Sequence, residues 1–180
     1  GSSYHIIDVA QKYYRPDEDG NVNYEKNLRK ISPFDGVRSF SEQTPASASI
    51  AFELQGWPQN SSEACATGLS SLADAVESVK SGRNQIAVAG GAEDSFTEFG
   101  DVSVAMFAAM KNDVLSKRND DPEHASRPFD KDRDGFVLAS GGGAIIVENL
   151  ESALRRGAPI FAEVIGFGKA GDGNTRTGMR

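Results

Sequence analysis

The clearest periodic pattern of apolar positions lies near the middle of the chain. Apolar side chains recur there at steps of three, four and three residues, at Leu69, Leu72, Val76 and Val79. Because this spacing places them on one face of a helix, it predicts a helix from about Ala66 to Lys80. Gly82 follows the last turn, as glycine commonly does at a helix end. The sequence therefore predicts an amphipathic helix that starts immediately after residue 65.

Other stretches predict four shorter helices. We expect them within residues 24–30, 46–54, 94–111 and 150–156. The second of these is small and apolar, which indicates a buried helix. Residues 112–131 are polar and predict a long surface loop.

Short apolar runs predict four strands. They cover residues 86–89, 136–138, 144–147 and 160–165. The first run does not alternate with polar residues, which indicates a strand buried on both faces and ended by Gly90-Gly91. Gly141-Gly142-Gly143 predicts a hairpin between the second and third runs, and close backbone approach to a nucleophile is the alternative use of these glycines. Because helices and strands alternate, we expect the α/β fold class.

Length and composition restrict the classes of protein to which the chain can belong. Its 180 residues fit one domain or a large part of one, and 38% hydrophobic and 25% charged residues are usual for a soluble protein. The formal net charge of −7 argues against a nucleic-acid binder, which needs a basic face. No apolar run is long enough to cross a bilayer, and the first residues do not resemble a signal peptide. One cysteine permits no disulfide within the chain, so a cytoplasmic location is expected.

The single cysteine, Cys65, immediately precedes the predicted central helix. Unpaired N–H groups at a helix start favour a thiolate, the form of cysteine that acts as a nucleophile. Ala64, Ala66 and Gly68 are small enough to let a substrate carbonyl reach the sulfur, and the Cys65 N–H is placed to donate to the oxyanion that forms. These residues indicate acyl transfer through a thioester. A buried cysteine that caps a core helix is the alternative.

Two other motifs suggest ligands but lack the partners that such ligands need. Asp130 to Gly135 begins like a calcium-binding EF-hand loop, but Gly141 stands where the loop requires its bidentate glutamate. A turn held by salt bridges from Arg127 and Arg133 is the better interpretation. Gly166 to Gly171 fits the G-x-G-x-x-G pattern, but no helix follows it. Neither a metal nor a nucleotide cofactor is therefore expected.

Four segments, in order along the chain, resemble those of one enzyme family. They are Ala64-Cys65-Ala66-Thr67-Gly68, Gly90-Gly91-Ala92-Glu93, the loop from Lys117 to Val137 with Ala125-Ser126-Arg127-Pro128-Phe129-Asp130, and Arg156 to Gly168. In these segments the chain is similar to β-ketoacyl synthases, the condensing enzymes of the thiolase superfamily. Residues 1–60 match the family only loosely.

The resemblance implies a fold and a reaction. The family fold is a layered αβαβα sandwich of two similar halves, normally in a homodimer, and residues 1–180 would be part of the N-terminal half, incomplete at both ends. In the implied reaction an acyl group moves from the phosphopantetheine of an acyl carrier protein to Cys65. Malonyl-acyl carrier protein then loses carbon dioxide, and its carbanion attacks the thioester to give a 3-oxoacyl chain, in fatty-acid or polyketide synthesis. No cofactor is implied beyond the carrier-bound phosphopantetheine.

The resemblance also assigns roles to individual residues. Cys65 would be the catalytic nucleophile that carries the acyl chain. Phe107 and Met110 would line the acyl tunnel and select chain length, and Lys111 would meet the acidic carrier protein. An ordinary core helix with a surface lysine is the alternative for these three residues.

Several features depart from the family pattern. The family's two catalytic histidines and its lysine belong to its second half, which this chain does not contain; His5 and His124 match neither histidine motif, and His124 is expected to be a solvated surface residue. Ser140 stands where a carboxylate is usual, and Glu63 where threonine is common.

Because the histidines and the lysine are outside these residues, we expect Cys65 to accept an acyl group but the chain alone not to catalyse the condensation. The alternative is a non-catalytic partner or truncated scaffold that pairs with an active synthase, although such partners usually lack the cysteine.

Overall fold

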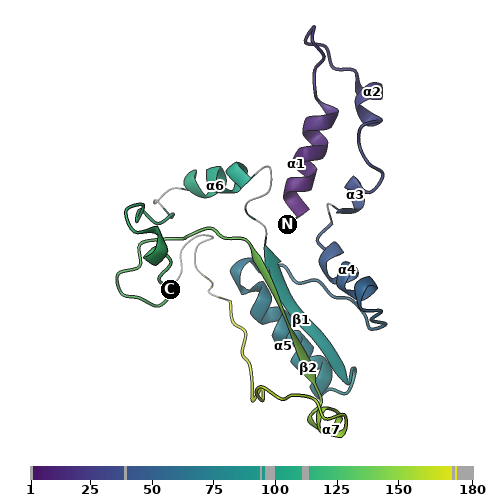
Figure 1. Cartoon of the computed structure of the whole chain (residues 1–180), viewed down its shortest axis with the longest axis vertical. Coiled ribbons are helices and arrows are strands. Elements are labelled where there is room, and N and C mark those ends of the chain that lie inside the picture. The colour runs from purple at the N-terminus through teal and green to yellow at the C-terminus, as the bar shows by residue number, and fades with distance from the viewer. Residues whose placement is uncertain are drawn as a thin grey trace. The chain divides into compact units, whose positions relative to one another are not determined.

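The computed structural model describes residues 2–38, 40–93, 95, 100–110, 114–171 and 173. The chain divides into two compact units, and the colour bar of Figure 1 gives the residue numbers by which their segments can be found. The first combines Gly1–Glu53 with Ala92–Gly141, and the second combines Leu54–Gly91 with Gly142–Arg180. Within the described ranges, no helix has the length and apolar character that crossing a bilayer requires.

Four helices form the beginning of the first unit. They are α1 Ser2–Tyr13, α2 Tyr24–Leu28, α3 Asp35–Arg38 and α4 Gln43–Ala51. α1 packs against α2 and α3, and α1 and α2 lie side by side in Figure 1. The buried Asn27 holds the connection between α1 and α2, because its Nδ2 donates to the carbonyl oxygens of Tyr13 (3.0 Å) and Arg15 (2.8 Å). α2 confirms the short helix predicted within residues 24–30.

The helix predicted within residues 46–54 is present as α4, but the prediction that it is buried is wrong. No residue of α4 is buried, and Ile50 is 81% exposed. The small and apolar residues are spread around the helix instead of gathered on one face, so α4 lacks the apolar stripe by which a helix packs.

The later part of the first unit consists of α6 Gly100–Ala108 and a long loop. α6 confirms the helix predicted within residues 94–111. In the loop, a single 3-10 turn lies at Pro122–His124, and a parallel bridge joins Leu115 to Phe136. The rings of Phe107 and Phe136 meet edge to face with their centroids 5.9 Å apart, so the loop is anchored on α6.

A two-stranded sheet lies at the centre of the second unit. β1 Ile86–Glu93 pairs with β2 Gly141–Glu148. The Asn149 N–H donates to the Gln85 carbonyl at 3.0 Å at one end of the pair, and Gly90 lies against Gly143 further along. Because the residue numbers rise along one strand while they fall along the other, the strands are antiparallel.

This pairing corrects the predicted hairpin. Residues 141–143 are part of β2 and pair with β1, while Phe136 is bridged to Leu115. Three consecutive glycines permit a tight turn but do not require one, and here they are extended. The hairpin predicted between residues 136–138 and 144–147 is therefore wrong.

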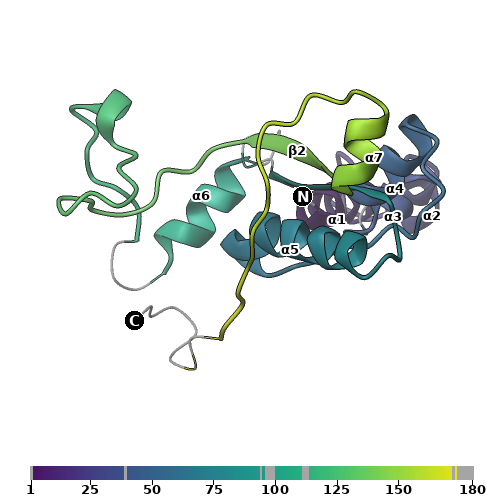
Figure 2. The same cartoon turned by 90° about the horizontal axis from the view of Figure 1, so that it is seen from below.

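The central helix is confirmed as α5 Thr67–Lys80, which lies along the sheet in Figures 1 and 2. Its buried residues are Ser70, Ala73, Ala75, Val76 and Val79. The contact with β1 is close at the helix start, where a Cβ on Gly91 would lie 3.4 Å from the Cα of Gly68. The Gly90 N–H donates to the Ser71 hydroxyl at 2.9 Å. Leu69, which belongs to the predicted apolar face, is 76% exposed.

β1 differs from its prediction in length and burial. It continues through Gly90 and Gly91 to Glu93 instead of ending there. Ala89 is buried, but Ile86 and Val88 are exposed, so the prediction of burial on both faces is wrong. α5 covers one face of the strand, which leaves alternate residues accessible.

α7 Leu150–Arg155 follows β2 directly and confirms the helix predicted within residues 150–156. The Asn149 side chain caps its start, and Gly157, with a φ of +67°, ends it. Residues 158–171 carry no regular secondary structure, so the strand predicted at 160–165 is wrong. The segment is apolar enough for a strand, but no described strand pairs with its backbone, and a strand exists only through such pairing.

Candidate active site

Cys65 lies at the start of α5, in a single 3-10 turn formed by Ala64–Ala66. Its thiol is free and exposed, which contradicts the alternative of a cysteine buried in the packing of the helix. The preceding residue, Ala64, has a φ of +50°, in the left-handed region that residues other than glycine seldom adopt. This conformation costs on the order of 1 kcal/mol and persists only where neighbouring contacts hold it.

Two hydroxyl groups from α5 make these contacts. The Thr67 hydroxyl accepts from the Glu63 N–H at 2.9 Å and donates to the Ala64 carbonyl at 2.7 Å. The Ala64 carbonyl also accepts from the Thr67 N–H. The Ser70 hydroxyl donates to the Glu63 carboxylate. Both residues before Cys65 are therefore tied to the helix that follows it.

A pocket of about 460 Å³ adjoins this turn, between α5 and the segment after α7. In Figures 1 and 2 that segment, coloured yellow-green, passes α5. Its lining includes Glu63 and Ala66 beside the cysteine and the apolar side chains of Leu72, Val164 and Phe167. Cys65 is not part of the lining, so the pocket adjoins the turn but does not include the thiol.

One lysine from the later segment reaches α5. Lys169 Nζ lies 2.6 Å from Asp74 Oδ1, and the Ser61 hydroxyl donates to the same carboxylate at 3.3 Å. The hydrogen bond to Asp74 raises the pKa of Lys169, and the nearby carboxylates of Glu63 and Glu77 act in the same direction. The ammonium group of Lys169 is therefore charged at neutral pH, and its ion pair with Asp74 links the segment after α7 to α5.

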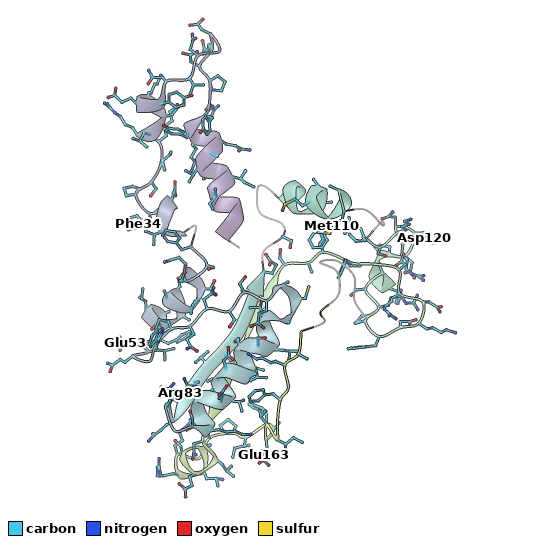
Figure 3. The ribbon with its side chains drawn as sticks, turned by 180° about the vertical axis from the view of Figure 1, so that it is seen from behind. Phe34, Glu53, Arg83, Met110, Asp120 and Glu163 are labelled. Carbon is cyan, nitrogen blue, oxygen red and sulfur yellow. The ribbon has the colours of Figure 1, made fainter. Side chains whose placement is uncertain are left out.

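The three residues predicted to bind substrate belong to the first unit, whereas Cys65 belongs to the second. Phe107 is half-buried on α6 against Phe136. Met110 follows α6 and is 39% exposed (Figure 3). Lys111 lies outside the described residues. Phe107 and Met110 are therefore placed only within the first unit.

The two departures from the family pattern have defined partners. The Ser140 hydroxyl accepts from the Ser95 N–H at 2.8 Å, within the first unit. The Glu63 carboxylate accepts from Ser70, as described above. His124 is exposed and pairs with Asp121 at 2.8 Å, which confirms the prediction of a solvated surface residue.

Arginines hold the turn from Asp130 to Gly135, and the predicted salt bridge is confirmed for Arg127, whereas Arg133 binds a backbone carbonyl instead. Arg127 donates to Asp130 Oδ2 from Nε (3.2 Å) and Nη2 (3.0 Å), while Arg133 binds the Asp130 carbonyl at 2.9 Å. The hydrogen bond from the Asp132 N–H, together with Arg127, lowers the pKa of Asp130. Among the described residues, no three or more His, Cys, Asp or Glu side chains are grouped to hold a metal ion.

The sequence pointed to Cys65 but not to the side chains around it. The sequence assigns no role to Thr67 or Ser70, because hydroxyl residues near a helix start are commonly explained as caps. Thr67 instead bonds backward across the cysteine, and its position directly after the Ala64-Cys65-Ala66 triplet was the available signal. Lys169 could not be found in this way, since its partner Asp74 lies 95 residues earlier.

Comparison with known proteins gives a consistent result. A family model described as "Beta-ketoacyl synthase, N-terminal domain" matches residues 5–153. The chain is 45% identical over 148 residues to 3-oxoacyl-[acyl-carrier-protein] synthase 2 of Vibrio cholerae, which covers 82% of this chain and 34% of that protein. The chain thus spans about a third of the length of this relative.

Solved structures give the same picture. A β-ketoacyl synthase from Burkholderia phymatum superimposes with a TM-score of 0.69 and 32% identity, over 83% of this chain and 35% of that one. A type II PKS ketosynthase in complex with its acyl-carrier protein also gives a TM-score of 0.69, with 26% identity, over 88% of this chain and 36% of that one. These likenesses confirm the predicted α/β, thiolase-like fold class. This chain forms part of such a fold.

Proposed function

The chain belongs to the β-ketoacyl synthase family, and from this premise we propose that it forms the acyl-accepting part of a 3-oxoacyl-acyl carrier protein synthase. The observation that carries the proposal is the exposed thiol of Cys65 at the start of α5. A helix start offers unpaired N–H groups and a partial positive charge, which favour a thiolate and an oxyanion beside it. Family membership supplies the reaction, and the position of the thiol supplies the acceptor.

The first step is acyl transfer to Cys65. The thiolate attacks the carbonyl carbon of a carrier-bound thioester, and the negative charge that develops on the carbonyl oxygen is stabilised by N–H donors such as that of Cys65 itself. The carbon–sulfur bond to phosphopantetheine then breaks. The carrier thiol leaves, and the acyl group remains on Cys65.

The second step consumes that thioester. Malonyl-acyl carrier protein loses carbon dioxide, and the resulting carbanion attacks the acyl carbon, which releases the Cys65 thiolate and leaves a 3-oxoacyl chain on the carrier. Decarboxylation requires groups that stabilise the enolate, and the resemblance places those groups outside these residues. We therefore assign acyl acceptance to this chain and condensation to the protein that combines it with those groups.

The partner that this chemistry requires is an acyl carrier protein. One structural relative is a type II PKS ketosynthase in complex with its acyl-carrier protein. We infer the same kind of partner here, with Phe107 and Met110 limiting the acyl chain and Lys111 meeting the acidic carrier surface. We also propose a homodimer, as is normal in the family. We further propose a cytoplasmic location, because an exposed thiol remains reduced in that compartment.

Mass spectrometry tests the assignment of Cys65. The complete gene product is incubated with acyl-acyl carrier protein, digested and mapped, and we expect an acyl adduct on the Cys65 peptide that Cys65→Ala abolishes. Because the side chain is exposed, the alanine variant should keep the thermal unfolding midpoint of the parent. A folded protein whose Cys65 stays unmodified would instead support the non-catalytic, partner-type alternative.

A further inference from the structure

The Thr67 hydroxyl makes two of the hydrogen bonds that hold the turn carrying Cys65. Thr67 Oγ1 lies 2.9 Å from the Glu63 nitrogen and 2.7 Å from the Ala64 oxygen, so it joins the residues on one side of the cysteine to the helix on the other. The remaining closure comes from the backbone, where the Ala66 N–H donates to the Glu63 carbonyl at 3.1 Å and the Thr67 N–H to the Ala64 carbonyl.

The hydroxyl acts at the strained position. Ala64 has a φ of +50°, and the Thr67 hydroxyl is one of two donors that hold its carbonyl, so removing the hydroxyl would favour relaxation toward negative φ. Such a relaxation would turn the following peptide group, which contains the Cys65 N–H. The orientation of the Cys65 side chain and the direction of its N–H bond would change together.

We propose that Thr67 is a positioning residue that sets the direction of the Cys65 thiol and N–H for acylation. The inference rests on the proposed role of Cys65 as acyl acceptor. Thr67 touches neither the substrate nor the sulfur in this scheme, because it acts through Ala64 and Glu63. Its contribution should therefore depend on the hydroxyl and not on the size of the side chain.

The test compares acylation with simple alkylation in the complete gene product. Thr67→Val keeps the shape of the side chain and removes the hydroxyl, and we expect the rate constant for Cys65 acylation by acyl-acyl carrier protein to fall roughly tenfold, the effect of about one hydrogen bond. Alkylation of the thiol by iodoacetamide should change by less than about twofold, since the thiol is exposed and this reaction needs no N–H donor. An equal loss in both reactions would overturn the proposal.

Two rescue variants separate positioning from general disruption. Thr67→Ser keeps the hydroxyl and should acylate at close to the parent rate. Adding Ala64→Gly to Thr67→Val should recover part of the lost rate, because glycine adopts positive φ without help. A serine variant as slow as the valine variant, or a glycine that recovers nothing, would count against the role given to Thr67.

A matched control and the parent protein complete the design. Thr44→Val makes the same chemical change on the exposed surface of α4 and should leave acylation unchanged. If the parent itself is not acylated at Cys65, the proposed function fails. If the parent is acylated and Thr67→Val matches it, only the inference about Thr67 fails.

Discussion

A methyl group at Gly135 should be among the least tolerated small changes in the chain. Gly135 has a φ of +145°, and a Cβ there would lie 2.6 Å from the Val114 oxygen, 2.7 Å from the Leu115 carbonyl carbon and 2.8 Å from the Ser116 nitrogen. Real Cβ atoms essentially never come within 3.0 Å of a heavy atom outside their own residue and its two chain neighbours. All three neighbours are backbone atoms fixed by hydrogen bonds, since the Phe136 N–H donates to Val114 at 2.7 Å and the Ser116 N–H to Phe136 at 2.9 Å. Gly135→Ala must therefore open this bridge.

The magnitude follows from two additive effects. A backbone conformation closed to residues with a side chain costs about 1–3 kcal/mol, and overpacking against atoms that cannot move aside costs about 1–3 kcal/mol. The expected loss in the free energy of unfolding is therefore about 2–6 kcal/mol, a large share of the roughly 5–15 kcal/mol that stabilises a native protein. Because Phe136 packs on Phe107, the displacement should also reach α6 and the proposed acyl-binding residues.

Denaturant unfolding of the complete gene product measures this loss. The matched control is Gly141→Ala, because a Cβ at Gly141 meets no atom within 4 Å and its φ is not in the positive region. The control should stay within about 0.5 kcal/mol of the parent. If Gly135→Ala is as stable as Gly141→Ala, the steric reasoning for this loop is refuted.

Two further predictions concern α7. Arg156 donates to both oxygens of Glu148 at 2.6–3.0 Å and, with Ser152, lowers the pKa of Glu148 below its ordinary 4.5. Because the folded-state pKa of Glu148 is lowered, the ionised pair stabilises the fold fully above about pH 4.5, and this stability is lost as the pH falls through the folded-state pKa. In urea unfolding at a series of acid pH values, the parent should therefore lose stability more steeply than Arg156→Gln. Parallel curves of stability against pH would contradict the role given to this pair. Asn149→Ala removes the side-chain cap of α7 and should lower the free energy of unfolding by about 1 kcal/mol in the same assay, whereas Asn149→Asp should lower it little. Equal stability of the parent and both variants would show that the cap is not needed.

The local features of the fold were predictable, and the long-range ones were not. The spacing of Leu72, Val76 and Val79 was enough to locate α5, and the cysteine just before it was enough to suggest the site. Whether residues 160–165 form a strand depends on a backbone partner, which the periodicity of a single segment does not contain. The hairpin failed for the same reason, since glycines compatible with a turn were recruited into pairing with a distant strand.

The candidate site likewise has features that the sequence predicts and features that only the structure shows. Cys65 was found because its type and its neighbours carry chemical meaning. Thr67 was hidden because its partners, Glu63 and Ala64, are bound through backbone atoms that any residue would supply. The left-handed conformation of Ala64 gave no signal at all, because alanine is not a residue that predicts positive φ.

The open sheet of the second unit has a practical consequence. Among the residues that the structure describes, β1 and β2 pair only with each other, so each has one edge without a strand partner, and Ile86, Val88, Ile145 and Ile146 are exposed on the same pair of strands. Unpaired edges with apolar side chains are templates for intermolecular strand addition and aggregation. These residues handled as an isolated polypeptide would tend to precipitate through that surface, and any preparation of them has to keep those edges covered.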